Sequence, residues 1–348
     1  MCKTYNVIVP ANERCGPTNL ALDLAALISS SGYRVNFFYL SEGTRPVDSP
    51  VDFTIQKLRL THLMSLDGII HTHGLRAEVI GFLIKIFRPR NRLVCTVHNH
   101  FIEDLTFIHR KLIVYAAFYI WKLCVSRYDR IIYISRDMKS YYRPFNLNKS
   151  SEVIYNFRWC TPFVKTTDYR TSVWSKAQKD KGKHVLLYCG ALIPRKNILN
   201  LMSYVSGLDS CSLLICGDGV QRKEVKKMAL ASDNIEYIGF KDNISEYISL
   251  ADFLILPSYA EGFPLTVIEG AHYGKITLVS DIPVHREIGG LGIAKVFNHK
   301  QMTSLDGAIG DLLGEPKTIR EARVSAIYSR LLSPRVALDA YLEALDLK

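Results

Sequence analysis

Two carboxylates with a defined spacing follow an apolar, strand-like run at 253–257. Glu261 precedes a helical pattern that begins at Pro264 and stops at Gly274, and Glu269 lies about one and a half turns inside that pattern. A helix N-terminus collects free N–H groups and the positive end of the helix dipole, so this loop could hold an extended anionic ligand whose two ends the carboxylates reach. The alternative for two carboxylates at this spacing is more common: Glu261 would interact with the helix dipole, and Glu269 would lie on a solvated face of the helix.

A pair of adjacent cations, Arg195 and Lys196, follows a second strand-like run at 184–189 and precedes another helical pattern. Two positive charges at a strand-to-helix turn suit a pyrophosphate, whose leaving charge has to be neutralised in the transition state. The alternative is a solvated turn that precedes a helix capped by Asn197.

Several glycines also follow strand-like runs. Gly217 lies in a Gly-Asp-Gly turn and Gly239 is followed by Phe240, and either turn taken alone is more often a plain turn than a ligand site. Gly16 opens a helix after the first strand, where backbone N–H groups can meet an anion. An ordinary capped helix start explains Gly16 equally well.

Four imidazoles end two further strands: those of His71, His73, His98 and His100. No Cys or carboxylate completes a metal-ligand spacing around them, so we expect no metal site. The segment 280–287 carries no side chain whose chemistry a ligand requires, and a structural role is favoured for it.

The elements that would position these residues alternate between strand and helix. The alternation over 5–155 predicts βαβ units and a parallel sheet, and after the polar, lysine-rich stretch 163–183 it resumes as a second doubly wound unit. The predicted fold is α/β, with two doubly wound Rossmann-like domains and a ligand in the central cleft if their strand ends face each other. We expect an N-terminal domain 1–165, a linker 166–183, a ligand-binding C-terminal domain 184–325 and a C-terminal helix 326–348 that packs back toward the N-terminal domain.

The stretch from Ser258 to Gly270, S-x-x-E-G-F-P-L-x-x-x-E-G, resembles the signature of retaining glycosyltransferase family 4, whose members have the two-domain GT-B fold. This resemblance implies that Glu261 contacts hydroxyls of the transferred sugar and that Glu269 binds the ribose hydroxyls of the donor. It also implies that the backbone between them holds the sugar and the β-phosphate, a stretch formed by Gly262, Phe263, Pro264 and Leu265.

Other motifs resemble the same family in the same order. Gly190 opens a segment similar to the family's G-x-L-x-P-R-K-N, which implies that Arg195 and Lys196 bind the diphosphate, although Ala191 stands where many members have Arg. The turns at Gly217 and at Gly239-Phe240 would line the nucleotide. Only Gly16 remains of the usual glycine pair near the donor phosphate, and His98, in the family's T-x-H position, would touch the donor sugar or phosphate. The implied catalytic set is Glu261, His98, Lys196 and Arg195.

The predicted function is a metal-independent, cofactor-free retaining transfer of a hexose from a nucleoside-diphosphate sugar. UDP-sugars are favoured as donors over GDP-mannose, and the expected acceptor is a saccharide or a lipid-pyrophosphate-linked saccharide in polysaccharide, O-antigen or capsule biosynthesis. Two alternatives stay open at this point: a sugar-nucleotide 2-epimerase-like enzyme of the same fold, and a catalytically silent membrane-associated scaffold.

The formal net charge of +11 is unevenly distributed, since residues 1–175 hold 23 Lys and Arg against 13 Asp and Glu. Such a basic half suits a polyanion or an anionic membrane. The usual nucleic-acid-binding patterns do not occur, so we expect no nucleic-acid partner. Basic residues interleave with bulky apolar ones at 82–92 and 107–127, which could rest on an anionic membrane, although a buried helix face with a basic edge is the alternative.

Compartment follows from cysteines and apolar runs. The eight cysteines are scattered without a C-x-x-C pair, which is typical of free thiols in a reducing compartment. No signal-peptide pattern opens the sequence, and the longest apolar run, 112–121, is well short of the roughly 20 residues that span a bilayer. We therefore expect a cytoplasmic protein, with membrane contact at most peripheral on the inner face of the cytoplasmic membrane.

Overall fold

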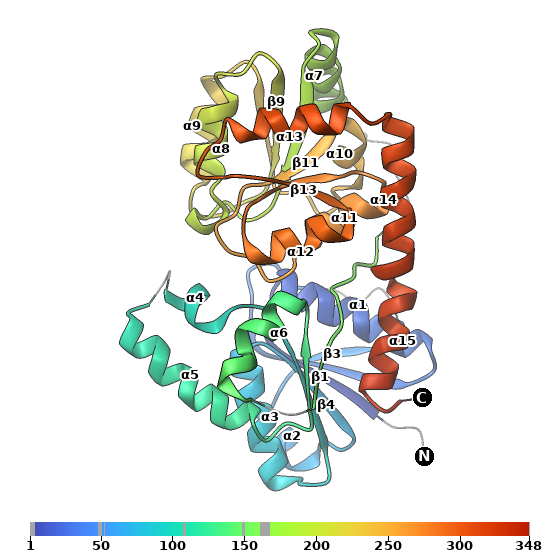
Figure 1. Ribbon diagram of the computed structural model, residues 1–348. Helices are drawn as coiled ribbons and strands as arrows, with labels where there is room; N and C mark the ends of the chain where they lie inside the picture. The colour runs from blue at the N-terminus through green and yellow to red at the C-terminus, as the bar shows by residue number, and fades with distance from the viewer. Residues whose placement is uncertain are drawn as a thin grey trace. The chain divides into compact units, whose positions relative to one another are not determined.

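A computed structural model describes residues 4–47, 51, 53–106, 109–147, 150–160 and 168–347. The chain divides into two compact units (Figure 1). Unit 1 consists of Met1–Trp159 and Leu332–Lys348, and unit 2 of Cys160–Leu331.

Unit 1 contains a parallel sheet in the order β3-β2-β1-β4-β5-β6-β7. Its strands are β1 (Thr4–Asn12), β2 (Arg34–Glu42), β3 (Thr54–Lys57), β4 (Ile69–His73), β5 (Arg92–Val97), β6 (Arg130–Tyr133) and β7 (Ser151–Val153). The central strands β1, β4 and β5 are buried along most of their length because helices cover both faces of the sheet. The strand order reverses between β1 and β4, and loops diverge at that point.

The helices of unit 1 come from both ends of the chain. They are α1 (Gly16–Ser30), α2 (Leu60–Ser65), α3 (Leu75–Phe87), α4 (Phe101–Thr106), α5 (Lys111–Val125), α6 (Arg136–Tyr142) and the C-terminal α15 (Pro334–Ala344). Helix α15 packs against α1, and its buried Tyr341 lies 5.9 Å from the ring of His71 and 6.3 Å from that of Phe157. Arg92 at the start of β5 donates to the carbonyl of Ala344 and pairs with Asp346.

Unit 2 repeats the plan with a parallel sheet in the order β10-β9-β8-β11-β12-β13. Its strands are β8 (His184–Cys189), β9 (Cys211–Cys216), β10 (Ile235–Gly239), β11 (Phe253–Leu256), β12 (Thr277–Ser280) and β13 (Ala294–Phe297). Its helices are α7 (Tyr169–Asp180), α8 (Ile198–Val205), α9 (Arg222–Leu230), α10 (Ser245–Leu250), α11 (Leu265–His272), α12 (Pro283–Leu291), α13 (Ser304–Leu313) and α14 (Lys317–Leu331). Both units therefore have the predicted doubly wound sheet, and here the order reverses between β8 and β11.

The stretch expected to be a linker, 166–183, is mostly the helix α7, so that prediction is wrong. Asp168 caps the helix by accepting from the backbone of Thr171. The buried side of α7 is polar: Ser175 donates to the carbonyl of Leu250, and Gln178 donates to that of Asp233. A helix held through hydrogen bonds leaves no apolar period in its sequence, which is why periodicity failed to find it.

Two boundaries near the C-terminus also differ from expectation. The segment 326–348 is not one helix, because α14 ends at Leu331 and α15 begins at Pro334. The division between the units falls at that break, with α14 in unit 2 and α15 in unit 1. Proline at the first position of α15 lacks the N–H that would continue the preceding helix, so the chain breaks there.

Candidate active site

The two loops on either side of the reversal point of unit 2 are joined by a buried ion pair. Lys196 lies in the loop after β8, and Glu261 in the loop after β11. The Lys196 ammonium nitrogen is 2.5 Å from Oε1 of Glu261, and the two side chains are 15% and 6% exposed. The hydroxyl of Ser258 donates to the same carboxylate oxygen at 2.6 Å. Glu261 is thereby fixed as an oriented acceptor at the carboxyl edge of the sheet.

The charge of Glu261 depends on these neighbours. Burial by itself raises the pKa of this carboxyl, but Lys196, together with Arg195 and His285, lowers it to about 2. A buried carboxyl that is ionised at neutral pH offers hydrogen-bond-accepting oxygens and no acidic proton. The geometry is suited to binding hydroxyl groups rather than to acid catalysis.

A second layer of side chains supports Glu261 from the end of β12. The Ser280 hydroxyl donates to the carbonyl of Ser258 at 2.5 Å. Nδ1 of His285 lies 3.0 Å from the carbonyl oxygen of Ser280, and burial lowers the pKa of His285 to about 4. A neutral His285 that donates through Nδ1 fits this arrangement. Ser280 and His285 thus support the site, a connection that sequence reasoning missed because three separate loops meet only in the fold.

Arg195 holds the loop of Glu261 from the other side. Its guanidinium donates to the carbonyl of Ala260 at 2.7 Å, and its own carbonyl accepts from the backbone N–H of Tyr259 at 2.9 Å. Arg195 and Lys196 are adjacent in sequence, and both lower the pKa of Glu261.

Asn197 is the N-cap residue of α8, as the alternative interpretation of this turn expected, but its side chain forms no capping hydrogen bond. It adopts a left-handed conformation with φ of 57°, and its amide donates to the carbonyl of Pro257 at 3.1 Å. Asn200 in turn donates to the Asn197 side chain at 2.6 Å. Asn197 therefore ties the loop after β8 to the end of β11.

The glycine turns of unit 2 interlock at the ends of neighbouring strands. The N–H of Gly217 donates to the carbonyl of Gly239 at 2.9 Å, and a Cβ on Gly217 would lie 1.9 Å from the carbonyl oxygen of Gly190. No larger residue fits at Gly217 without moving that loop. Gly239 has room for a side chain but has φ of +75°, and the ring of the following Phe240 is 42% exposed.

Helix α11 begins directly after the Glu261 loop, with Pro264 preceding its first residue. Its Thr266 hydroxyl donates to the carbonyl of Cys189 at the end of β8, 3.1 Å away. Glu269 is half-buried one turn further on, and its charge acts on the thiols of Cys189 and Cys216 at the ends of β8 and β9. Both predicted carboxylates therefore lie at the same edge of the sheet. Of the residues between them, Phe263 and Pro264 are buried, and Gly262 and Leu265 are partly exposed.

The candidates of unit 1 lie at the ends of its own strands. Gly16 begins α1, and nothing lies within 4 Å of a Cβ built on it. Nε2 of His98, just after β5, is 2.9 Å from Nδ1 of His73, while His71 bonds to Tyr5 and Thr96 at 2.7 and 2.8 Å. Burial lowers the pKa values of His98 and His71 to about 3, so these rings are neutral. The structure connects His73 to His98.

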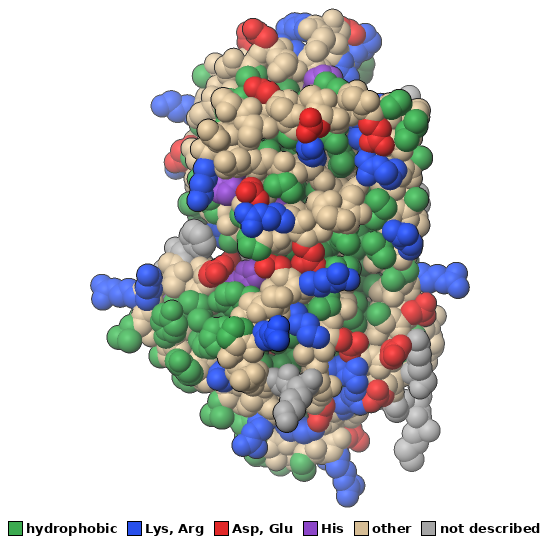
Figure 2. Space-filling model, viewed as in Figure 1, with side chains coloured by type: hydrophobic (Ala, Val, Ile, Leu, Met, Phe, Trp, Pro, Cys, Tyr) green, Lys and Arg blue, Asp and Glu red, His purple; other side chains and the backbone are tan. Residues whose placement is uncertain are grey.

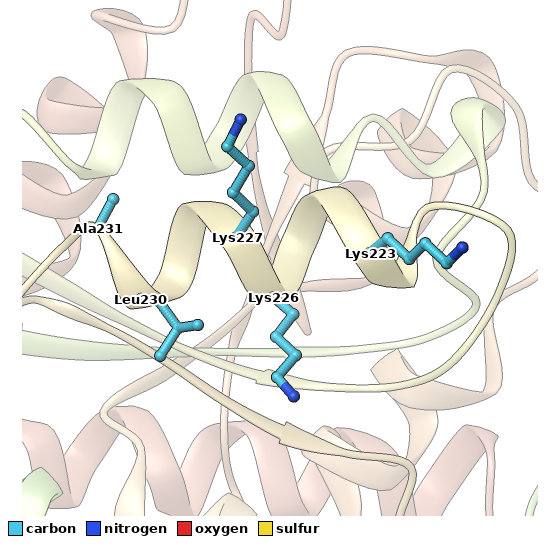
Figure 3. A pocket seen from close by; sticks show the side chains of 5 residues that line it. All are labelled: Lys223, Lys226, Lys227, Leu230 and Ala231. Atoms are coloured by element: carbon cyan, nitrogen blue, oxygen red, sulfur yellow. The ribbon is translucent and has the colours of Figure 1, made fainter.

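Two further kinds of ligand site could in principle occur in the fold: a metal site and an anion site beside α9. Among the described residues, no group of three or more His, Cys, Asp or Glu side chains is arranged to hold a metal ion. A hollow beside α9 is lined by Lys223, Lys226, Lys227, Leu230 and Ala231. Figure 3 shows the three ammonium groups pointing in different directions from that helix, so they do not converge on one anion.

Comparisons with known proteins identify the family to which the chain is similar. One family model, described as Glycosyltransferase Family 4, matches residues 16–158, and a second, Glycosyl transferases group 1, matches residues 171–328. The chain is 23% identical over 293 residues to the O-antigen biosynthesis glycosyltransferase WclY of Escherichia coli, covering 81% of each protein. It is 25% identical over 303 residues to the amylovoran biosynthesis glycosyltransferase AmsD of Erwinia amylovora, again covering 81% of each.

A solved structure shares the fold along the whole chain. HepE of Anabaena, in complex with UDP and glucose, superimposes with a TM-score of 0.79 at 15% identity, covering 99% of this chain and 100% of that one. At this level of identity the likeness concerns the fold.

Proposed function

Because this chain belongs to the GT-B glycosyltransferases of bacterial envelope polysaccharides, we propose that it transfers a hexose with retention from a UDP-sugar to a saccharide or lipid-pyrophosphate-linked saccharide. The family and the enzyme class were predicted from the sequence and are confirmed. The alternatives, an epimerase-like enzyme and a silent scaffold, are not favoured, since the related proteins are transferases.

The observation that carries the proposal is the ionised, doubly held carboxylate of Glu261. A carboxylate held by Lys196 and Ser258 has its orientation fixed before a ligand arrives, so it can accept hydrogen bonds from sugar hydroxyls without reorganising. Its low pKa and its ion pair argue for orienting the sugar rather than for attacking it. Glu261 therefore acts as a binding residue in this proposal.

The diphosphate of the donor would lie between Lys196 and the N-terminus of α11. A cation and free helix N–H groups together suit an anion. In the proposed step, a bond forms between the acceptor oxygen and the anomeric carbon while the bond from that carbon to the phosphate oxygen breaks. The acceptor proton passes to an oxygen of the leaving phosphate, and the nucleoside diphosphate departs. The chain's own cations would neutralise the charge of the departing nucleoside diphosphate, so we propose a reaction without a metal ion. Chelation by EDTA should therefore leave the rate of transfer unchanged.

The preference for UDP is supported by HepE, the structural neighbour that holds UDP and glucose. GDP-mannose remains the second choice. The lipid-linked acceptor is supported by the basic character of residues 1–175 and by the naming of the relatives for O-antigen and amylovoran biosynthesis.

A thermal-shift panel of UDP-, GDP- and ADP-sugars tests the donor. A ligand that binds only the folded protein raises the melting temperature according to its occupancy, so the UDP-sugars should give the largest shift. Glu261→Gln keeps the shape of the side chain and should reduce the shift given by the UDP-sugar more than that given by UDP alone. Asp311→Asn, which breaks an exposed Lys–carboxylate pair of the same 2.5 Å length, is the matched control. No shift with any nucleotide sugar, or equal shifts in Glu261→Gln and wild type, would contradict the proposal.

A further inference from the structure

Helix α5 of unit 1 is apolar on both of its faces. Its inner face packs into the core, where Phe118 and Trp121 contact the ring of Phe101 at 5.5 and 5.2 Å. Its outer face is exposed and equally apolar, with exposed fractions of 46% to 83% at Leu112, Ile113, Tyr115, Tyr119, Ile120 and Leu123. We call these six side chains the outer face of α5. A helix that is hydrophobic all round is normally buried or in contact with lipid.

Among the described residues, exposed large hydrophobic side chains are concentrated on this helix. Of the 20 exposed large hydrophobic side chains among the described residues, six lie on the outer face of α5, and the others are dispersed over many elements. Figure 2 shows the hydrophobic side chains gathered over α5. Single exposed apolar residues need no explanation, but a contiguous patch marks a docking site.

The charged residues on α5 and directly at its two ends have one sign. No carboxylate occurs in the sequence between Asp104 and Asp129, whereas Arg110, Lys111 and Arg127 lie at the two ends of the helix and are exposed. A second copy of this chain would bring the same cations against each other. A surface of anionic lipid headgroups complements them.

The outer face also has the side-chain chemistry of a membrane interface. Tyr115 and Tyr119 carry an apolar ring and a polar hydroxyl, a combination that is enriched where hydrocarbon meets water. Lys111 and Lys122 can extend their charged ends toward headgroups while their methylene stems stay in the apolar layer. No helix among the described residues has the length and apolar character to cross a bilayer, so contact through α5 would be with one face of it.

The helix is firmly attached to the unit behind it. The indole N–H of Trp121 donates to the buried carboxyl of Glu78 on α3, and the hydroxyl of Tyr128 donates to the Glu78 carbonyl at 2.6 Å. The outer face can therefore enter a headgroup layer without withdrawing Phe118 or Trp121 from the core.

We propose that the outer face of α5 is the surface through which this protein docks on an anionic lipid bilayer. The docking goes beyond the proposed transfer reaction and does not depend on it. It also narrows the sequence-based expectation: in the segment 82–92, Arg92 is engaged with the C-terminal helix, and the exposed apolar residues there are Ile86 and Phe87.

The test is sedimentation of the full chain with vesicles, without any sugar nucleotide. Vesicles of phosphatidylglycerol and phosphatidylcholine in about equal parts should bind the protein, vesicles of phosphatidylcholine alone should bind it weakly, and salt should weaken binding to the anionic ones. The triple change Leu112→Ser, Ile120→Ser and Leu123→Ser should lower the partition coefficient by more than about tenfold, because burying even one large apolar side chain is worth about that factor. Arg110→Glu with Lys111→Glu should remove the preference for anionic lipid.

The matched control changes three exposed apolar residues of unit 2, Val220, Leu230 and Leu313, to serine and should leave binding unchanged. Unaltered circular dichroism and melting temperature establish that each variant is folded, and Tyr119→Trp should show a blue-shifted emission on anionic vesicles. The proposal is overturned if the wild type fails to bind anionic vesicles, or if the α5 triple variant binds as well as the control. A dimer in sedimentation velocity that the α5 changes dissolve, with no vesicle binding, would overturn it in favour of a second copy.

Discussion

Two buried glutamates, one in each unit, differ in charge because only one of them has cationic neighbours. Glu78 in unit 1 and Glu261 in unit 2 are 3% and 6% exposed. Burial raises the pKa of Glu78 to about 7, since the groups that oppose this effect are the neutral N–H groups of Trp121 and Gly74. Burial also raises the pKa of Glu261, but Lys196, with Arg195 and His285, outweighs that effect and lowers the pKa to about 2. Burial without a cation therefore leaves the Glu78 carboxyl titrating near neutral pH, whereas the cations beside Glu261 keep that carboxyl ionised.

The two glutamates also differ in role, since Glu78 lies in the packed core of its unit and Glu261 lies at the candidate site. Glu78 accepts from Trp121 inside the packing between α3 and α5, whereas Glu261 lies at the strand-end edge where the loops of unit 2 meet. Perturbed pKa values mark functional sites only when the geometry agrees, and here the geometry selects Glu261.

Removing the Lys196 cation should have the largest effect on the free energy of unfolding. Lys196→Met leaves Glu261 buried without its partner, so we expect a loss of about 3–5 kcal/mol in the free energy of unfolding of unit 2. Lys295→Met breaks an exposed pair of the same length with Asp311 and should cost less than about 1 kcal/mol. Urea unfolding followed by hydrogen exchange in β8 and β11 measures both. The contrast between the two glutamates would fail if both substitutions cost the same.

The pH dependence should then separate the two glutamates. The pKa of Glu78 is raised on folding, so its stabilising effect is complete below its ordinary value of 4.5 and is lost as the pH rises toward about 7. The loss should be on the order of 3 kcal/mol. The pKa of Glu261 is lowered, so its contribution is present above 4.5 and is lost as the pH falls toward about 2.

Tryptophan fluorescence can follow unit 1 separately in a Trp174→Phe background, because the remaining Trp121 and Trp159 both lie in that unit. Glu78→Gln keeps a carbonyl acceptor for Trp121 and should flatten the profile between pH 4.5 and about 7. A profile with the same slope in Glu78→Gln and in the parent would show that another group titrates there.

The alternation of strands and helices could be predicted from the sequence, because apolar runs and turn residues are local signals. It also placed Glu261, Lys196 and Gly217 at strand ends, where the doubly wound topology brings them to one edge. Helix α7 was missed because its buried face is polar. The support from Ser280 and His285 has no local signal, since it depends on contacts among loops far apart in the chain.

Removing the Ser280 hydroxyl should have the smallest effect on the free energy of unfolding. Ser280→Ala removes the hydroxyl that donates to the carbonyl of Ser258, so we expect a loss of about 1 kcal/mol in the free energy of unfolding. Ser329→Ala removes a similar hydroxyl-to-carbonyl bond from the exposed face of α14 and should cost nothing measurable. If Ser258 positions Glu261 through this bond, Ser280→Ala should also weaken binding of the UDP-sugar relative to UDP in calorimetry. Equal weakening for both ligands would mean that Ser280 stabilises the loop without orienting the Glu261 carboxylate.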